Sequence, residues 1–259
     1  MATPAHQLTA MENGGLVVIT VPPRPYRCTP APYERASLIA NYLARRKPRS
    51  KLLIVDANDT FPLMGAMLDA WDAKFGDTVE WLSGDFGGAL VAVDPAGRAL
   101  ITEDETFAAD VASVIPPQRA GSLALDAGLA DDSGWCPIDA RDFSSRRADA
   151  IHVLGDAIEP GDMPRSAFAA ADQARLCAAA LGSALTGREA PPAALENACY
   201  FLLDDDDGLV SGGRYKIADG RISGIEGYSS SAGEDPDTRR ETARAGERWF
   251  TELTAEVFR

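Results

Sequence analysis

The stretch from residue 16 to residue 56 constrains the fold most, because it predicts a strand, a helix and a second strand in close succession. Leu16–Val21 and Leu52–Asp56 are short apolar runs that predict buried strands. Between them, Tyr33–Arg46 carries apolar residues at helical spacing, and its basic last turn is followed by a proline, which is a stop signal. A right-handed crossover makes the two strands parallel, so we predict half of a doubly wound nucleotide-binding unit.

The turn after the first strand departs from a dinucleotide-binding turn. Asp56 ends the second strand, where a dinucleotide fold places its ribose-binding acid. The turn should read G-x-G-x-x-G, so that the backbone can approach a pyrophosphate. Residues 22–32 instead hold five prolines and no glycine, and proline lacks the N–H donor that cradles a phosphate. We therefore predict a nucleotide-binding shape that does not bind NAD.

The rest of the chain adds a β-hairpin, a long helix and a small antiparallel sheet. The elements expected after residue 60 are a helix at 63–75, strands at 79–82, 89–93, 99–102, near 107 and at 112–115, a short helix near 122–127, a strand at Ile151–Leu154, a helix at Pro164–Leu185, strands at 198–203, 209–217 and 221–225, and a closing helix at 236–258. Composition shifts after Pro191 and Pro192.

Charge and composition exclude several classes of function. A net charge of −14 argues against nucleic acid, which needs a basic stripe, and it suits either a basic partner such as a cytochrome or ordinary solubility. No apolar run is long enough to span a bilayer, and the N-terminus lacks the pattern of a signal peptide. Four cysteines without C-x-x-C, beside only His6 and His152, disfavour a disulfide scaffold or a zinc cluster. Buried thiols and a disulfide between distant positions both remain open.

Three segments carry a resemblance to a known family. They are the proline-rich stretch around Cys28, the stretch Ile151–Ala157 with its Gly-Asp pair, and the Glu-Asn-Ala-Cys-Tyr stretch around Cys199. Together they resemble the flavin-binding subunit of flavocytochrome c sulfide dehydrogenase, in the superfamily of FAD/NAD-linked disulfide oxidoreductases. The resemblance implies an α/β fold in which a nucleotide-binding-like three-layer domain (1–115) precedes the second half of an FAD-binding domain (116–190) and a small α+β C-terminal domain (191–259).

The resemblance also implies an activity and a redox pair. Cys28 and Cys199 would form a redox disulfide beside FAD, sulfide would attack it, and electrons would pass to FAD and on to a cytochrome c. The alternative for the cysteines is two unpaired, partly buried thiols. Arg27 and Arg35 lie close enough in sequence to favour a thiolate at Cys28. Glu34 matches a glutamate near the flavin that could shuttle protons, or it is an acid favouring a helix N-terminus.

The cofactor-binding residues follow in the same way. By resemblance, Asp156 would accept a hydrogen bond from a ribityl hydroxyl, Gly155 would let the backbone approach, and the helix after Met163, Pro164 and Arg165 would point its positive end at the flavin. Trp249 matches a tryptophan close to the flavin ring. The alternatives are a common Gly-Asp turn and a core aromatic residue. Cys177 and His152 are predicted to lie in the core, and Cys136 carries no redox role.

The first FAD-binding stretch of the family has no counterpart in this sequence, which leaves three hypotheses. The chain is a truncated or separately encoded part of the flavoprotein that needs a complementing FAD-binding piece, or a binding module that has lost FAD, or the product of a gene start placed too late. We expect the family's activity for the intact assembly. The resemblance implies a periplasmic location, where a disulfide persists, but without an export signal a cytoplasmic location is the alternative.

Overall fold

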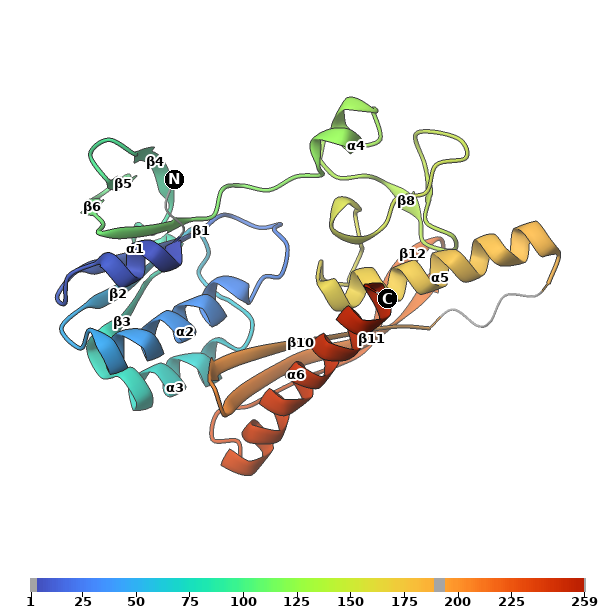
Figure 1. Cartoon of the computed structure of the whole chain (residues 1–259). Coiled ribbons are helices and arrows are strands. Elements are labelled where there is room, and N and C mark those ends of the chain that lie inside the picture. The colour runs from blue at the N-terminus through green and yellow to red at the C-terminus, as the bar shows by residue number, and fades with distance from the viewer. Residues whose placement is uncertain (1–3, 189–193, 259) are drawn as a thin grey trace.

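The computed structural model describes residues 4–188 and 194–258, and its first half is built on a parallel sheet (Figure 1). Four strands lie in the order β3-β2-β1-β7, and the two central ones pair in parallel from Leu16 with Lys51 to Val21 with Asp56. The prediction of parallel strands joined by a crossover helix is confirmed. The strands are β1 (Leu16–Val21), β2 (Lys51–Asp56), β3 (Val79–Leu82) and β7 (Val111–Val114).

The parallel sheet is the middle of three layers. Its side chains alternate between two cores, so Val17 and Ile19 pack toward the helices while Val18 and Val55 pack toward the hairpin sheet. The outer layers are the helices α1 (Pro4–Ala10), α2 (Ala31–Arg46) and α3 (Met64–Phe75), and the antiparallel strands β4 (Leu90–Asp94), β5 (Ala99–Thr102) and β6 (Thr106–Ala108). Short 3-10 turns η1 (Gly76–Thr78) and η2 (Gly84–Phe86) link β3 to its neighbours.

Asp56 is buried and serves the core of this domain. Its carboxylate accepts hydrogen bonds from the hydroxyl of Tyr33, from the indole N–H of Trp81 and from both the backbone and the side-chain N–H of Asn58. The residue has no exposed surface. The position that holds a ribose in a dinucleotide fold is therefore engaged by the protein itself, which supports the expectation that NAD does not bind here.

The middle of the chain differs from the prediction at one element. An extended link follows β7 and leads to α4 (Ser122–Asp126), the two-residue strands β8 (Ile138–Asp139) and β9 (Ser144–Ser145), the 3-10 turn η3 (Gly155–Ala157) and the helix α5 (Ala167–Thr186). The strand predicted at Ile151–Leu154 is wrong, because within the described residues its only ladder contact is a single bridge between His152 and Ser144. A short apolar run becomes a strand only where a neighbouring strand pairs along it.

The C-terminal region is a three-stranded antiparallel sheet with one long helix against it. Its elements are β10 (Ala194–Asp204), β11 (Asp207–Ala218), β12 (Arg221–Ser229) and α6 (Pro236–Val257), in the strand order β10-β11-β12. The predicted elements are confirmed, with longer strands. The proposed boundary between residues 190 and 191 lies outside the described residues.

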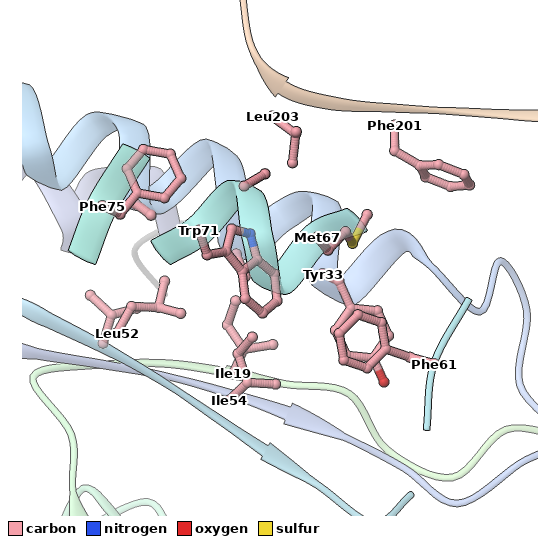
Figure 2. Packing of buried hydrophobic residues seen from close by; sticks show 14 of the residues in the cluster. Ile19, Tyr33, Leu52, Ile54, Phe61, Met67, Trp71, Phe75, Phe201 and Leu203 are labelled. Atoms are coloured by element: carbon pink, nitrogen blue, oxygen red, sulfur yellow. The ribbon is translucent and has the colours of Figure 1, made fainter. Parts of the chain in front are cut away.

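Strand β10 joins the two halves of the molecule. It packs against both α2 and α5. Leu195, near its start, belongs to the core under α5, whereas Phe201 and Leu203, further along, belong to the core of the first domain. Figure 2 shows Phe201 and Leu203 reaching from this strand toward the aromatic cluster that contains Tyr33, Phe61 and Trp71. The middle of β10 therefore lies at the seam, that is, where the two halves of the molecule meet.

Ion pairs hold the tip of this sheet to the first domain. Lys74 at the end of α3 binds the carboxylates of Asp204 and Asp207 at 2.7 and 2.8 Å, and Arg239 on α6 also binds Asp207. Asp204 and Asp207, at the two ends of the acidic run, are therefore paired with basic side chains. No group of acidic, cysteine or histidine residues suited to a metal ion occurs within 4–188 and 194–258. In the same residues no helix has the length and apolarity needed to cross a membrane.

Candidate functional site

Cys28 and Cys199 lie side by side at the seam between the two halves. Cys28 belongs to the loop after β1 and Cys199 to the middle of β10, and the two thiols are within hydrogen-bonding reach of each other. Both residues are half-buried, and both thiols are free. Residues far apart in the sequence are thus brought together by the packing of β10 on α2.

The backbone holds Cys28 in a strained conformation. Its φ of 47° is in the left-handed region, which costs a residue other than glycine about 1–2 kcal/mol. Two backbone hydrogen bonds stabilise this geometry: the N–H of Cys28 donates to the carbonyl of Arg165 at 2.7 Å, and its carbonyl accepts from Ala31 at 2.8 Å. The loop that carries the thiol is therefore tied to the residue that precedes the start of α5.

The two thiols have opposite electrostatic environments. A hydrogen bond from Cys28 lowers the pKa of Cys199 to about 7, against the effect of burial, and Asn197 and Ser166 lower it further. The same hydrogen bond, together with burial and the charge of Glu34, raises the pKa of Cys28. The donors around Cys199 therefore favour the thiolate of the reduced pair at Cys199.

The expectation that Arg27 and Arg35 favour a thiolate at Cys28 is wrong. The guanidinium of Arg27 pairs with Asp156 at 3.4 Å, and that of Arg35 donates to the hydroxyl of Ser113 at 2.9 Å. The pKa of Cys28 is raised rather than lowered, by its hydrogen bond to Cys199 and by burial. Proximity in sequence did not determine where these two long side chains point.

Glu34 faces the cysteine pair from the first turn of α2. Its Oε1 accepts a hydrogen bond from the backbone N–H of Leu202 at 3.0 Å, across the seam. Burial raises its pKa, while the N–H of Leu202 and the charge of Arg35 oppose that shift. A carboxyl group with a raised pKa beside two sulfurs is suited to accept and return protons.

An apolar cavity of about 400 Å³ lies against the cysteine pair. Cys28, Cys199 and Glu34 line it together with Trp249 of α6. The ring of Trp249 stacks on that of Phe168 in the first turn of α5, with 5.5 Å between the ring centroids. Three of the predicted site residues and the predicted tryptophan therefore converge on one cavity.

A second cavity, of about 550 Å³, contains Asp156. Asp156 and Arg165 line it together with the N-terminal residues Ser166 and Ala167 of α5. Cys28, Ser166 and Ala167 line both cavities, so Cys28 lies between them.

The other predicted cofactor residues lie before or near the start of α5. Gly155 has a φ of 70°, which suits glycine, and its N–H donates to Gln173 of α5 at 2.8 Å. Met163 is fully buried in the core under α5, and Pro164 is half-buried. The Arg165 guanidinium lies 3.7 Å over the ring of Trp135 and donates to the carbonyl of Ile158. Arg165 lines the second of these two cavities, and Gly155, Met163 and Pro164 line neither.

Two residues that the sequence did not single out connect α5 to the cysteine pair. Ser166 caps α5, and its hydroxyl donates to Oδ1 of the buried Asn197, whose amide Nδ2 donates to the sulfur of Cys199 at 3.5 Å. The sequence contains a pattern that could have identified each of them. Serine just before an apolar helix is an N-cap pattern, and residues two apart on a strand share a face.

These residues fit a flavin. A half-exposed carboxylate at Asp156, the positive end of a 20-residue helix and the aromatic wall at Trp249 surround two adjoining cavities that share the redox-capable Cys28. Such groups can bind ribityl hydroxyls, the electron-rich edge of a flavin and its ring system, respectively.

The fold is shared with several chains of known structure. A similar chain occurs in the Tetrahymena thermophila mitochondrial ATP synthase, with a TM-score of 0.58 and 16% identity over 80% of this chain and 52% of that one. The HOCl-induced flavoprotein disulfide reductase RclA of Escherichia coli matches with a TM-score of 0.51 and 15% identity over 78% of this chain and 42% of that one. A NAD-dependent persulfide reductase of A. fulgidus matches with a TM-score of 0.51 and 13% identity over 93% of this chain and 50% of that one. The chain thus spans about half the length of these structures, and the likeness shows the fold.

Two family models match opposite ends of the chain. Residues 3–116 match the central region of the flavoprotein chain of sulfide dehydrogenase (flavocytochrome c), and residues 191–258 match the flavin-binding region of flavocytochrome c sulphide dehydrogenase. The first match carries Cys28 and Glu34, and the second carries Cys199 and Trp249. On this combination of a flavin-compatible site and two matched regions, the chain belongs to the family of flavin-binding oxidoreductase chains of flavocytochrome c sulfide dehydrogenase.

Proposed function

We propose that this chain oxidises sulfide through a Cys28–Cys199 disulfide, with FAD as the electron acceptor and a cytochrome c as the next carrier. The observation that carries the proposal is the convergence of Cys28, Cys199 and Glu34 on one apolar cavity. Neither cysteine is close to the other in sequence, and each lies in a separate matched region. The family match supports the substrate class.

The chain's own residues supply a complete exchange step. In the oxidised pair, hydrosulfide forms a new S–S bond with one cysteine sulfur, the bond between the two cysteines breaks, and its electron pair leaves on the other sulfur as a thiolate. Glu34 is placed to take the proton that hydrogen sulfide must lose to become the nucleophile. A second hydrosulfide that attacks the outer sulfur of the persulfide releases it as hydrodisulfide and leaves both cysteines reduced. Bound FAD would supply two-electron oxidation of this reduced pair and one-electron transfer onward.

The flavin would be held by groups from both halves of the molecule. We assign the ribityl contact to Asp156, with Gly155 allowing the backbone to approach, and the aromatic wall to Trp249. The start of α5 would stabilise negative charge on the reduced ring, and the sequence from Met163 through Arg165 positions that start. Arg165 contributes positive charge beside the second cavity, which we propose as its role toward the cofactor.

A basic cytochrome c subunit or soluble cytochrome c is the proposed partner. The chain's net charge of −14 favours encounter with a basic protein, because opposite charges steer association. An oxidising compartment such as the periplasm, where the disulfide would persist, is the proposed location.

The experiment is a visible spectrum of the chain after incubation with FAD and removal of the excess, followed by anaerobic sulfide. We expect a retained flavin band that sulfide bleaches and that added cytochrome c restores as the cytochrome is reduced. Cys177→Ser is the matched control, because Cys177 is buried in the core and donates to a backbone carbonyl. A retained flavin that sulfide leaves oxidised contradicts the proposal, and failure to retain flavin favours a binding module without FAD.

A further inference from the structure

We propose that Asn197, held by Ser166, sets the direction of the exchange: Cys199 is the sulfur that leaves as a thiolate, and Cys28 is the sulfur that receives the incoming nucleophile. This inference rests on the proposed function and adds which end of the disulfide reacts. It makes Ser166 and Asn197 positioning residues of the site.

The amide of Asn197 turns its nitrogen toward Cys199. The hydroxyl of Ser166 accepts a hydrogen bond from the N–H of Ala169 as the cap of α5 and donates its own proton to Oδ1 of Asn197. With Oδ1 engaged, the amide Nδ2 is directed at the sulfur of Cys199. The nitrogen lies 3.5 Å from that sulfur, closer than Oδ1 at 3.9 Å. Because Asn197 is only 3% exposed, water does not compete for the amide.

A buried N–H donor favours the charged form of the sulfur that it faces. Hydrogen bonds to a thiolate stabilise it, and a thiol of lower pKa is the better leaving group in disulfide exchange. The other titratable groups around Cys199 are Cys28, Glu34, Tyr215 and Tyr228, with Glu247 lining the same cavity. Of these, Cys28 donates to Cys199, whereas the charge of Glu34 disfavours its thiolate.

Cys28 has the environment of the attacked sulfur. Burial and the charge of Glu34 raise the pKa of both sulfurs, whereas Asn197 and Ser166 lower that of Cys199 and the backbone N–H of Ala31 lowers that of Cys28. Because Cys199 has the two side-chain donors, Cys28 is the poorer leaving group of the two. It also lines both cavities, whereas Cys199 lines one. In this step hydrosulfide bonds to the sulfur of Cys28 to form a persulfide, the disulfide bond between Cys28 and Cys199 breaks, and its electron pair goes to Cys199.

The experiment locates the added sulfur in the wild-type chain. The protein is oxidised with diamide, freed of diamide, mixed briefly with sodium sulfide, quenched with iodoacetamide and mapped by mass spectrometry. We expect the extra sulfur on Cys28 in roughly tenfold excess over Cys199. An excess on Cys199, or equal amounts, overturns the inference and leaves the proposed function intact. A disulfide that sulfide does not open overturns the proposed function itself.

Variants test the role of the amide. Asn197→Asp keeps an acceptor for Ser166 but turns a carboxylate oxygen toward Cys199, so we expect the excess on Cys28 to be lost and the alkylation of Cys199 to shift to higher pH. Ser166→Ala should shift the alkylation of Cys199 in the same direction. Ser183→Ala is the matched control, because Ser183 lies at the far end of α5 and its hydroxyl donates to Arg188. Thermal melting checks that Asn197→Asp and Ser166→Ala are folded. If alkylation of Cys199 in these folded variants has the same pH profile as in the wild-type chain, the proposed role of the amide is overturned.

Discussion

Glu34 and Leu202 are joined across the seam of the molecule by a hydrogen bond of 3.0 Å from the N–H of Leu202 to the Glu34 carboxylate. Glu34 follows Cys28 by six positions, and Leu202 follows Cys199 by three. This bond therefore fixes the two cysteine-bearing segments against each other while it places a carboxylate beside both sulfurs. Structural and chemical roles meet in one side chain, and substitutions can separate them.

Glu34→Gln should keep the structure and change the chemistry. The glutamine oxygen still accepts from Leu202, but the negative charge that raises the pKa of both thiols is gone. We expect thiol alkylation to shift to lower pH, and the rate of sulfide-dependent flavin reduction to fall about 100-fold through loss of the base. Glu247→Gln, an exposed carboxylate lining the same cavity, is the control. Unchanged reduction rates in Glu34→Gln would restrict Glu34 to a structural role.

Glu34 should also make stability depend on pH. Burial raises its pKa in the folded protein above the ordinary value of 4.5. A group whose folded pKa is raised stabilises the fold fully below its ordinary pKa, and this contribution is lost as pH rises through the folded pKa. We expect the free energy of unfolding of Glu34→Gln, relative to the native chain, to increase from acidic to neutral pH in urea titrations. A difference that does not change with pH contradicts this.

Cys28→Ser and Cys199→Ser should each abolish sulfide-dependent flavin reduction, because either substitution removes the disulfide that sulfide opens. Flavin binding itself should remain, since the proposed flavin contacts at Asp156, Trp249 and the start of α5 are unchanged. The measurement is the anaerobic bleaching rate at equal flavin content. Full activity in either variant would contradict the disulfide mechanism.

NADH should neither bind to the first domain nor reduce the flavin. The Asp56 carboxylate is engaged by Tyr33, Trp81 and Asn58, and the loop after β1 is proline-rich. Titration calorimetry and the flavin spectrum check this. Asp56→Ala should lower the free energy of unfolding by about 3 kcal/mol, because buried donors lose their acceptor, without creating NADH binding. Rapid bleaching by NADH would overturn our interpretation of the proline-rich loop.

Lys74→Met should loosen the sheet that carries Cys199. Burial works against the Lys74 charge, but hydrogen bonds to Asp204 and Asp207 raise its pKa. Its side chain is 31% exposed, so solvent reduces the effect and we expect a loss of about 1–2 kcal/mol, or roughly 5 °C in melting temperature. Arg45→Met, which removes a pair with a more exposed carboxylate, should cost less. Equal losses in both variants would contradict the special position of Lys74.

Much of the fold follows from local sequence patterns. The β-branched runs at Leu16–Val21 and 52–56, with a helical repeat between them, are the parallel unit that the structure contains. The three strands and closing helix of the C-terminal region were likewise predicted from alternation and turns. The strand predicted at Ile151–Leu154 failed because its apolar residues pack without a partner strand along their length.

The sequence by itself determined most of the secondary structure, the absence of a glycine turn after β1 and the residue types available for redox chemistry, because these depend mainly on neighbours within one turn or strand. The pairing of Cys28 with Cys199 was expected only from resemblance, since spacing carries no information about contact. Tertiary structure decided the rest: β10 packs on both α2 and α5, and that packing sets Asn197 against Cys199 and turns Arg27 toward Asp156. Such contacts join distant segments, so their geometry depends on the whole core rather than on any local pattern.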